Sequence, residues 1–554
     1  MTRPVLVTLV AVGMSFPCFG APAAHNHVET ILRSVPIPQS NGVTFDGQDH
    51  LVIASVATQA ILVMDTNTGK IIKKYTDPLI ASPDDVDVAK DGSIYFTDMH
   101  TGNIGRIAPD GRVSVVENLG PWVNSLRMSP AGDQLFVGHC IGADRLTIID
   151  LTGKAKPRVF AEGIGWPNSM SFGPDGRLYT PLNVKRQVVR WNTDTGESEV
   201  VVNLDSIPSS VKFDSKGRML ISEFQTGRVL RFDPATKELK VLSDRLGSGL
   251  DNVGVDSTGR VFATSNNHGG VTEILEDGSL KSLSPQGLLT PSGLTVMQGS
   301  SGEQLVVADY ANLRFYDIKS LKETRTLNTG FYPYVKDEKE MGEAMNFVFP
   351  FTVAVDGKKL IATSYVSNAV NVFDLQQNRV TRNIDGNTPL NAIAFGSDII
   401  VSELKTQSVV SISENGERRT LASGISVPSG LVARQKDLWV ADWSKGQILK
   451  VISDGEVLER PSVLVQGLAQ PEGMAIAPDG SILAVESGAG RLLKVDPTNG
   501  KTTVLADNLK TGLEGLSEFP PTNYFSAVAV DADGWIYVSC DAGREVVRLK
   551  GPWN

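Results

Sequence analysis

Six polar residues recur at one position of a repeat in the first half of the chain, and their chemistry suits a metal ion. We call this the lead position; each member directly precedes a short alternating apolar stretch, and successive members are about 40 residues apart. Its occupants are Asn41, Asp84, Asn124, Asn168, Ser209 and Asp251. Carboxylate and amide oxygens bind hard cations such as Ca²⁺ and Mg²⁺, and imidazole would extend the choice to Zn²⁺ or Mn²⁺. The same side chains also satisfy backbone donors in turns, so a structural role stays open.

The end of the second strand of each repeat is the other position that could carry chemistry. His100, His139 and His268 lie within a few residues of such ends, and Glu223 occupies one. A metal-bound water needs a general base within hydrogen-bonding reach. Glu223 or His139 is therefore the expected catalytic base at the rim of the site.

The second half of the chain places acids and aromatic residues at the equivalent positions. Its lead positions are Ser292, Phe351, Asn391, Ser429, Glu472 and Ser526, and Tyr310, Tyr365 and Trp443 follow three of its second strands. Acids beside aromatic faces suit a cationic, sugar-like or flat organic ligand. The expected ligand-binding residues are Asp442, Trp443, Glu472 and Glu403. Alternatively, these acids cap loop amides and the aromatic residues cover the surface.

The element that must position these residues is a meander of four short strands. Residues 167–202 show it best: "NSMSF", "RLYTPL", "QVVRW" and "SEVVV" alternate or cluster apolar residues and are joined by turns that contain Asp-Gly and Thr-Gly. The pattern occurs twelve times along the chain at the spacing of a propeller blade. We therefore predict an all-β fold, a tandem pair of six-bladed β-propellers with four-stranded antiparallel blades.

The predicted domain limits depend on how the two rings close. The chain opens with a fourth-strand pattern, residues 28–34, and ends after a third strand. We expect residues 28–34 to complete the sixth blade and "SLKSLS" (279–284) to complete the twelfth, which overlaps the ring ends and covers sheet edges. This gives propellers at 25–277 and 278–554. The alternative, in which residues 28–34 close the twelfth blade, uses the same number of strands.

The N-terminus and the composition indicate an exported protein. Residues 1–24 combine an early Arg, a short apolar run and Ala21-Pro22-Ala23, which fits a cleaved signal peptide and predicts a periplasmic or secreted location. A net charge of -10 without basic clusters argues against nucleic acid, and later apolar stretches are too short for membrane insertion. The remaining cysteines, Cys140 and Cys540, are expected as buried or free thiols.

Two long connections, residues 328–350 and 507–525, belong to the second half. They carry several aromatic residues, and "KDEKEMGEAMNFV" in the first could form a short helix. Long ordered loops are usually functional, so a lid over a pocket is one expectation. Packing against the neighbouring ring or a partner protein is the other.

Two motifs resemble the NHL and SMP-30/gluconolactonase-like six-bladed propellers. "WPNSMSFGPDGRLY" is similar to that family's "PNG-h-x-h-S-P-D-G" signature, and "LDNVGVDSTGRVF" to its "PDG-h-x-h-D-x-x-G". The resemblance implies that Asn168, Asp251 and Asn124 bind a divalent metal. The family's first-blade Glu is Asn41 here, and Ser209 stands where the family has its Asp.

The expected function is hydrolysis of a lactone-like or other cyclic ester with a divalent ion (Ca²⁺, Mg²⁺ or Zn²⁺). Asn124, Asn168 and Asp251 would hold the ion, with Asp84 as a further ligand. One alternative is a propeller scaffold without catalysis that binds a small molecule or a protein on one face. The other is elimination, since "YFTDMHTGNIGRIAPDGRVSVV" is similar to the virginiamycin B lyase repeat.

Overall fold

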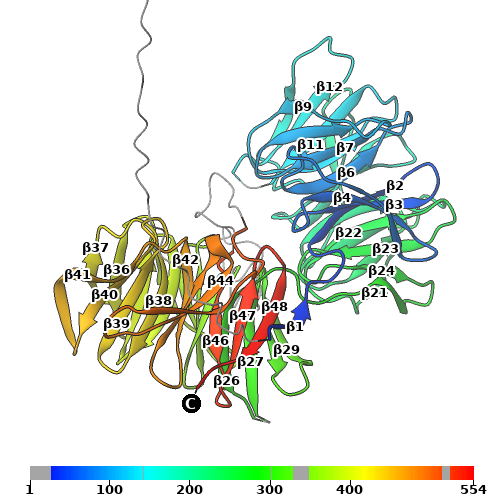
Figure 1. The fold of residues 1–554 in the computed structure, drawn as a ribbon. Coiled ribbons are helices and arrows are strands. Elements are labelled where there is room, and N and C mark those ends of the chain that lie inside the picture. The colour runs from blue at the N-terminus through cyan, green and yellow to red at the C-terminus, as the bar shows by residue number, and fades with distance from the viewer. Residues whose placement is uncertain (1–26, 141, 301, 329–348, 514–523, 554) are drawn as a thin grey trace, which may run out of the picture.

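A computed structural model describes residues 27–140, 142–300, 302–328, 349–513 and 524–553. Over these residues the chain forms twelve four-stranded antiparallel sheets, arranged as two rings side by side (Figure 1). The described part contains no α-helix, only the short 3-10 turn η1 (Ser487–Ala489). None of its helical segments is long and apolar enough to cross a membrane. The predicted tandem of six-bladed propellers is confirmed.

The first propeller contains six complete blades. Their strands are β2 (Ser40–Phe45), β3 (His50–Ser55), β4 (Ala60–Asp65) and β5 (Lys70–Tyr75); β6 (Pro83–Val88), β7 (Ile94–Asp98), β8 (Asn103–Ile107) and β9 (Val113–Asn118); β10 (Val123–Met128), β11 (Gln134–His139), β12 (Arg145–Asp150) and β13 (Arg158–Glu162); β14 (Ser171–Phe172), β15 (Leu178–Leu182), β16 (Gln187–Trp191) and β17 (Ser198–Asn203); β18 (Pro208–Phe213), β19 (Met219–Glu223), β20 (Val229–Phe232) and β21 (Leu239–Ser243); and β22 (Leu250–Val255), β23 (Val261–Ser265), β24 (Val271–Ile274) and β25 (Leu280–Ser284).

The second propeller takes its last strand from the start of the chain. Its blades are β26 (Pro291–Gln298), β27 (Glu303–Asp309), β28 (Asn312–Asp317) and β29 (Glu323–Asn328); β30 (Thr352–Asp356), β31 (Lys359–Ser364), β32 (Ala369–Asp374) and β33 (Arg379–Asp385); β34 (Pro389–Phe395), β35 (Asp398–Glu403), β36 (Ser408–Ile412) and β37 (Arg418–Ser423); β38 (Pro428–Arg434), β39 (Asp437–Asp442), β40 (Gln447–Ser453) and β41 (Glu456–Gln466); β42 (Pro471–Ile476), β43 (Ile482–Glu486), β44 (Arg491–Val495) and β45 (Thr502–Ala506); and β46 (Val528–Val530), β47 (Trp535–Cys540), β48 (Glu545–Lys550) and β1 (Glu29–Arg33).

Tight turns and apolar faces explain why these segments form blades. Gly176 (φ 74°) and Gly196 (φ 79°) adopt the left-handed conformation in the two hairpin turns of residues 167–202, as the sequence predicts. The apolar residues pack between neighbouring blades: Val43 and Leu51 of the first blade share a cluster with Phe262 of the sixth. Each blade therefore buries its faces only against its neighbours, and the ring must close.

The expected closure is wrong, and the alternative arrangement is the one observed. Strand β1 pairs with β48, where Arg33 meets Glu545 (3.1 Å) and Glu29 meets Arg548 (2.8 Å). Strand β25 stays beside β24, because the turn at Gly278 joins the two directly and a local hairpin forms more readily than a distant pairing. Residues 29–33 thus leave the predicted 25–277 unit, and residues 280–284 join it. The first propeller is inserted between the last strand of the second propeller and the rest of it.

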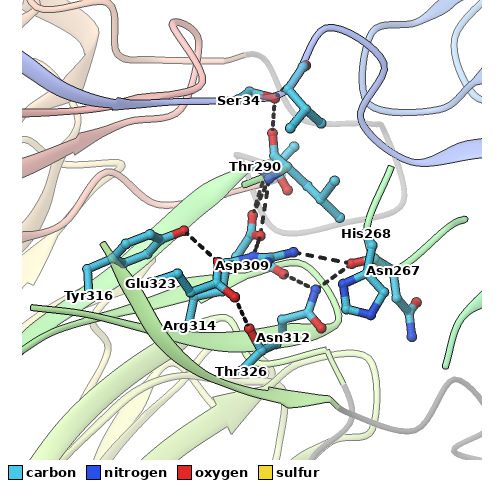
Figure 2. Close-up of polar contacts among 12 residues, drawn as sticks. Ser34, Asn267, His268, Thr290, Asp309, Asn312, Arg314, Tyr316, Glu323 and Thr326 are labelled. Atoms are coloured by element: carbon cyan, nitrogen blue, oxygen red, sulfur yellow. Dashed lines mark hydrogen bonds and ion pairs between the residues drawn. The ribbon is translucent and has the colours of Figure 1, made fainter. Parts of the chain in front are cut away.

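A buried polar network holds the two propellers together (Figure 2). The two linkers run side by side, and the Ser34 hydroxyl donates to the Leu289 carbonyl (2.7 Å). Arg314, 2% exposed at its side chain, donates through Nε to Asp309 (2.5 Å) and through Nη2 to the carbonyl of Asn267 in the first propeller (3.4 Å). Asn312 donates to the same carbonyl (2.6 Å). Hydrogen bonds therefore connect the two linkers to each other and the first propeller to the second.

Two groups of predictions fall outside the described residues. The signal peptide at 1–24 is one. The predicted helix at "KDEKEMGEAMNFV" and most of the two long connections are the other. These stay predictions. Cys140 and Cys540 are buried and form no disulfide, as expected.

Candidate functional site

Five of the six lead residues of the first propeller leave the regular sheet pairing at β-bulges. The pairing of first and second strands shifts across Asn41, Asp84, Asn124, Ser209 and Asp251. A bulge turns a side chain out of the ladder and occurs often beside active sites. The repeat thus places polar side chains from successive blades at one mouth of the ring.

Asp84 is the centre of this mouth. Its Oδ1 accepts a hydrogen bond from the Asn41 amide and its Oδ2 accepts one from the Asn124 amide (2.6 Å). The side-chain oxygen Oδ1 of Asn41 in turn accepts from the Asn266 amide (2.6 Å). These residues are buried, and they form a chain of hydrogen bonds across four blades that fixes the orientation of the Asp84 carboxylate.

A second carboxylate, Asp251, shares the mouth with Asp84. Burial raises the pKa of Asp84 well above its usual range, and the negative charges of Asp251 and Asp85 raise it further. Burial and the charge of Asp85 raise the pKa of Asp251 to about 7, while Asn252 and Lys212 oppose the shift. The Asp251 charge thus disfavours the charged form of the buried Asp84, which calls for a proton or a cation beside this carboxylate.

The donor set at this mouth fits a hard divalent cation. The described residues include no group of three or more His, Cys, Asp or Glu side chains placed to hold a metal ion. Two carboxylates would therefore act together with amide oxygens, which Ca²⁺ and Mg²⁺ accept. The Asn124 Oδ1 atom supports this, because it is buried and makes no hydrogen bond to any described residue. Asn168 is buried as well, but its Oδ1 accepts from the backbone N–H of Ser169 (2.8 Å).

Charged residues continue from the mouth into the first propeller. Lys212 is buried and donates to the Ser169 hydroxyl (3.1 Å). Burial lowers the pKa of Lys212 to about 7, and Arg127 lowers it further, whereas Asp85, Asp87 and Asp251 oppose this. Arg127 and Asp87 form an ion pair (2.9 Å). Basic and acidic side chains thus lie close together in this part of the first propeller.

The predicted catalytic bases lie in well-defined but separate environments. Glu223 is fully buried and accepts from Arg228 Nε (2.5 Å) and from the Thr226 hydroxyl (2.7 Å). His139 is buried with Nε2 3.3 Å from the Leu119 carbonyl oxygen, and burial followed by Arg145 lowers its pKa to about 4. No contact between either residue and the Asp84–Asp251 pair is found in the described structure.

Acids at the ends of second strands have a repeated structural role. Asp98 accepts from the backbone of Ala81 and Ser82, and Asp309 accepts from Leu289 and Thr290, all within 3.1 Å. The same role falls to two predicted ligand-binding residues. Asp442 accepts from Ser426 and Val427, and Glu403 accepts from Asn387. The capping alternative therefore describes the observed contacts of Asp442 and Glu403.

The mouth of the second propeller is largely apolar. Phe351, Leu390 and Phe525 form a buried cluster there, with the rings of Phe351 and Phe525 4.8 Å apart. Glu472 and Trp443 do come together, since the indole N–H donates to Glu472 Oε1 (3.2 Å). Burial and the charge of Asp541 raise the pKa of Glu472 well above its usual range. Buried aromatic side chains and one buried acid thus share this mouth.

A cavity of about 230 Å³ lies between the two propellers. The first propeller contributes loops that include Ser82, His100 and Trp122, and the second contributes aromatic side chains. Those side chains are Tyr310, Phe349, Phe351, Tyr365 and Tyr524.

Tyr310 connects this cavity to the acid pair. Burial raises the pKa of Tyr310 well above its usual range, and the charges of Tyr524, Asp84 and Asp251 raise it further. Its backbone is held at φ 54°, a conformation that bulky residues rarely adopt. The second propeller thus supplies one wall of the approach to the first propeller's mouth.

Comparison with known proteins relates the chain to the SMP-30/gluconolactonase-like proteins. Residues 23–244 match the model of the family described as SMP-30/Gluconolactonase/LRE-like region. A gluconolactonase from Zymomonas mobilis is 23% identical over 249 residues, which is 42% of this chain and 62% of that protein. The chain thus spans less than two thirds of this relative's length. The expected resemblance to the SMP-30/gluconolactonase-like propellers is confirmed, and the family model covers most of the first propeller.

Solved propeller structures also align with the chain. Virginiamycin B lyase from Staphylococcus aureus aligns over 50% of this chain and 94% of its own, at 17% identity and a TM-score of 0.37. The extracellular domain of a putative one component system from B. thetaiotaomicron aligns over 94% of this chain and 82% of its own, at 12% identity and a TM-score of 0.34.

Proposed function

We propose that the first propeller hydrolyses lactone-like cyclic esters with a divalent cation at its mouth. The observation that supports this proposal most strongly is the pair of like-charged carboxylates, Asp84 and Asp251, at one mouth. The Oδ1 atom of Asn124, which makes no hydrogen bond to the described residues, belongs to the same mouth. The similarity of the chain to a gluconolactonase, and the match of residues 23–244 to the SMP-30/Gluconolactonase/LRE-like model, support the choice of substrate class.

Asp84, Asp251 and Asn124 would hold the cation, and Asn168 is the further ligand that the family resemblance implies. When bound, such an ion polarises an ester carbonyl and lowers the pKa of a water molecule. Asn41 and Asn266 hold the Asp84 carboxylate in one orientation, so the site is organised before substrate arrives.

The general base must be a group other than Asp251, because a carboxylate that holds the cation stays charged and accepts a proton poorly. His139 and Glu223 stay the bases predicted from the sequence. The base would take a proton from water as the water oxygen attacks the carbonyl carbon. The ring C–O bond then breaks, and the proton passes to the leaving alkoxide to give a hydroxy acid.

A lactone panel with matched variants tests this proposal. The wild-type protein supplied with Ca²⁺, Mg²⁺ or Zn²⁺ is expected to open a lactone with a gain of one water in product mass. Asp251→Asn is expected to lower the rate by at least about tenfold, because it removes a carboxylate that would hold the cation. Asp91→Asn, in an exposed turn of the same propeller, is the control and should leave the rate unchanged.

Two results would contradict the proposal. One is full activity of Asp251→Asn and Asp84→Asn. The other is a product with the mass of the substrate, which would indicate elimination instead of hydrolysis. Export through a cleaved signal at 1–24 and a protein partner on a propeller face stay predictions from the sequence.

A further inference from the structure

Arg544 is a partly buried cation in the wall of the cavity between the propellers. It lies in the turn between β47 and β48, and one of its guanidinium N–H groups donates to the Ala57 carbonyl of the first propeller. Among the described residues, no carboxylate lies within ion-pair distance of it. The nearby Asp541 is occupied instead by Gly512, Leu513 and the Ser526 hydroxyl.

Other blades show what the fold does with an arginine near this position. Arg228, Arg314 and Arg491 each follow the acid that ends a second strand by five residues and form an ion pair with it. Their charges are neutralised within the blade. Arg544 is different because it lines the cavity and its guanidinium makes one hydrogen bond to the described residues. A partly buried guanidinium of this kind favours an anionic partner.

Aromatic side chains form a large part of the remaining cavity wall. Tyr365 packs edge-on against Phe351, with ring centroids 4.9 Å apart, and Trp122 packs against His100 at 5.6 Å. Tyr310 and Tyr524 complete the wall. A cavity of this kind binds an apolar or flat body and uses a few polar groups to orient it.

We infer that the cavity between the propellers binds a small amphipathic carboxylate, with its flat or extended apolar body among the aromatic side chains and its carboxylate on Arg544. The planar guanidinium offers parallel N–H groups, which suit a carboxylate. The site requires both propellers, since Ala57 and Trp122 come from one and Arg544 and Tyr310 from the other. The inference stands whether or not the Asp84–Asp251 pair hydrolyses esters, because its tests measure binding alone.

Calorimetric titration of the full chain with 2-naphthoate and with neutral 2-naphthamide tests this inference. The carboxylate is expected to bind at least about tenfold more tightly than the amide. Arg544→Gln should remove this preference while leaving binding of the amide unchanged. Tyr365→Ala should weaken both probes, because it removes part of the aromatic wall.

Two controls keep the result specific. Arg112→Gln changes an exposed arginine of the first propeller and should leave both affinities unchanged. Arg544→Lys keeps the charge and should retain part of the preference for 2-naphthoate over 2-naphthamide. Thermal melting of Arg544→Lys and Arg544→Gln checks that both variants are folded. Equal binding of naphthoate by the wild type and Arg544→Gln, equal affinity for the two probes, or no binding of either would overturn the inference.

Discussion

The Asp84–Asp251 pair decides how the first propeller's mouth responds to protons and cations. Neither acid is neutralised by a direct ion pair within the described residues, and Lys212 affects Asp251 only in part. Burial and like charge therefore favour the protonated form of at least one of the two acids. A bound divalent cation would reverse this balance and favour both charged forms.

Stability should fall as pH rises through the folded-state pKa of Asp251. This pKa is about 7, above the ordinary 3.8, so the folded chain binds more protons than the unfolded chain between these values. In chelator, Asp251→Asn should therefore raise the melting temperature at pH 8 and change it little at pH 4, where the acid is neutral. At pH 8 the substitution should raise the free energy of unfolding by at least about 1 kcal/mol. Thermal melts at both pH values check this, and an equal shift at the two would contradict it.

At the scale of elements, the geometry of each blade places the lead residues at the mouth, and the closure by β1 holds the blades of the second propeller in a ring. Bulges turn the lead residues toward the mouth, and acids at second-strand ends hold the preceding loops. Strand β1 covers the edge of β48 and packs Ile31 and Leu32 against a cluster that includes Leu294 and Tyr537. An uncovered β48 would leave an open sheet edge and part of this core exposed.

Removing residues 29–33 should loosen the second propeller and leave the first intact. Hydrogen exchange should accelerate in β46, β47, β48 and β26, which lie beside the lost strand or across the closure. Exchange in β22, β23 and β24 should stay slow, because β25 completes their blade. Faster exchange in the sixth blade instead would contradict the observed closure.

At the scale of the whole molecule, the inserted topology makes the junction part of the site. Two linkers and the Arg314 network fix one propeller against the other, and the cavity lies between them (Figure 2). Each propeller alone would lack half of the cavity wall. The second propeller therefore shapes access to the first propeller's mouth, whether or not its own mouth binds anything.

Arg314→Met should destabilise the chain by about 3–5 kcal/mol, because it leaves the buried Asp309 charge uncompensated. The double variant Arg314→Met, Asp309→Asn should recover part of this loss, since the two residues form one network. Urea denaturation curves measure both effects. Unchanged midpoints for the single variant would show that the junction contributes little.

The sequence predicts the architecture well because each blade repeats the same local signals. It predicts closure poorly, since β1 and β25 have similar patterns and only the hairpin at Gly278 and the ion pairs of β1 distinguish them. The acid pair is visible as lead residues, but the role of Tyr310 is not, because contacts between the rings depend on packing. One signal that points to the first propeller is the third residue after the lead position. It includes Asp87, Arg127 and Lys212 in the first propeller and is Ala, Val or Thr throughout the second.

Cation titration of the chelator-treated protein tests the central claim most directly. Calorimetry with Ca²⁺, Mg²⁺ and Zn²⁺ in turn should find a single tight site for at least one ion. The site should be lost in the double variant Asp84→Asn, Asp251→Asn and kept in Glu472→Gln, which changes the buried acid of the other mouth. If no ion binds, or if the double variant binds as tightly as the wild type, the first propeller's mouth is not a metal site.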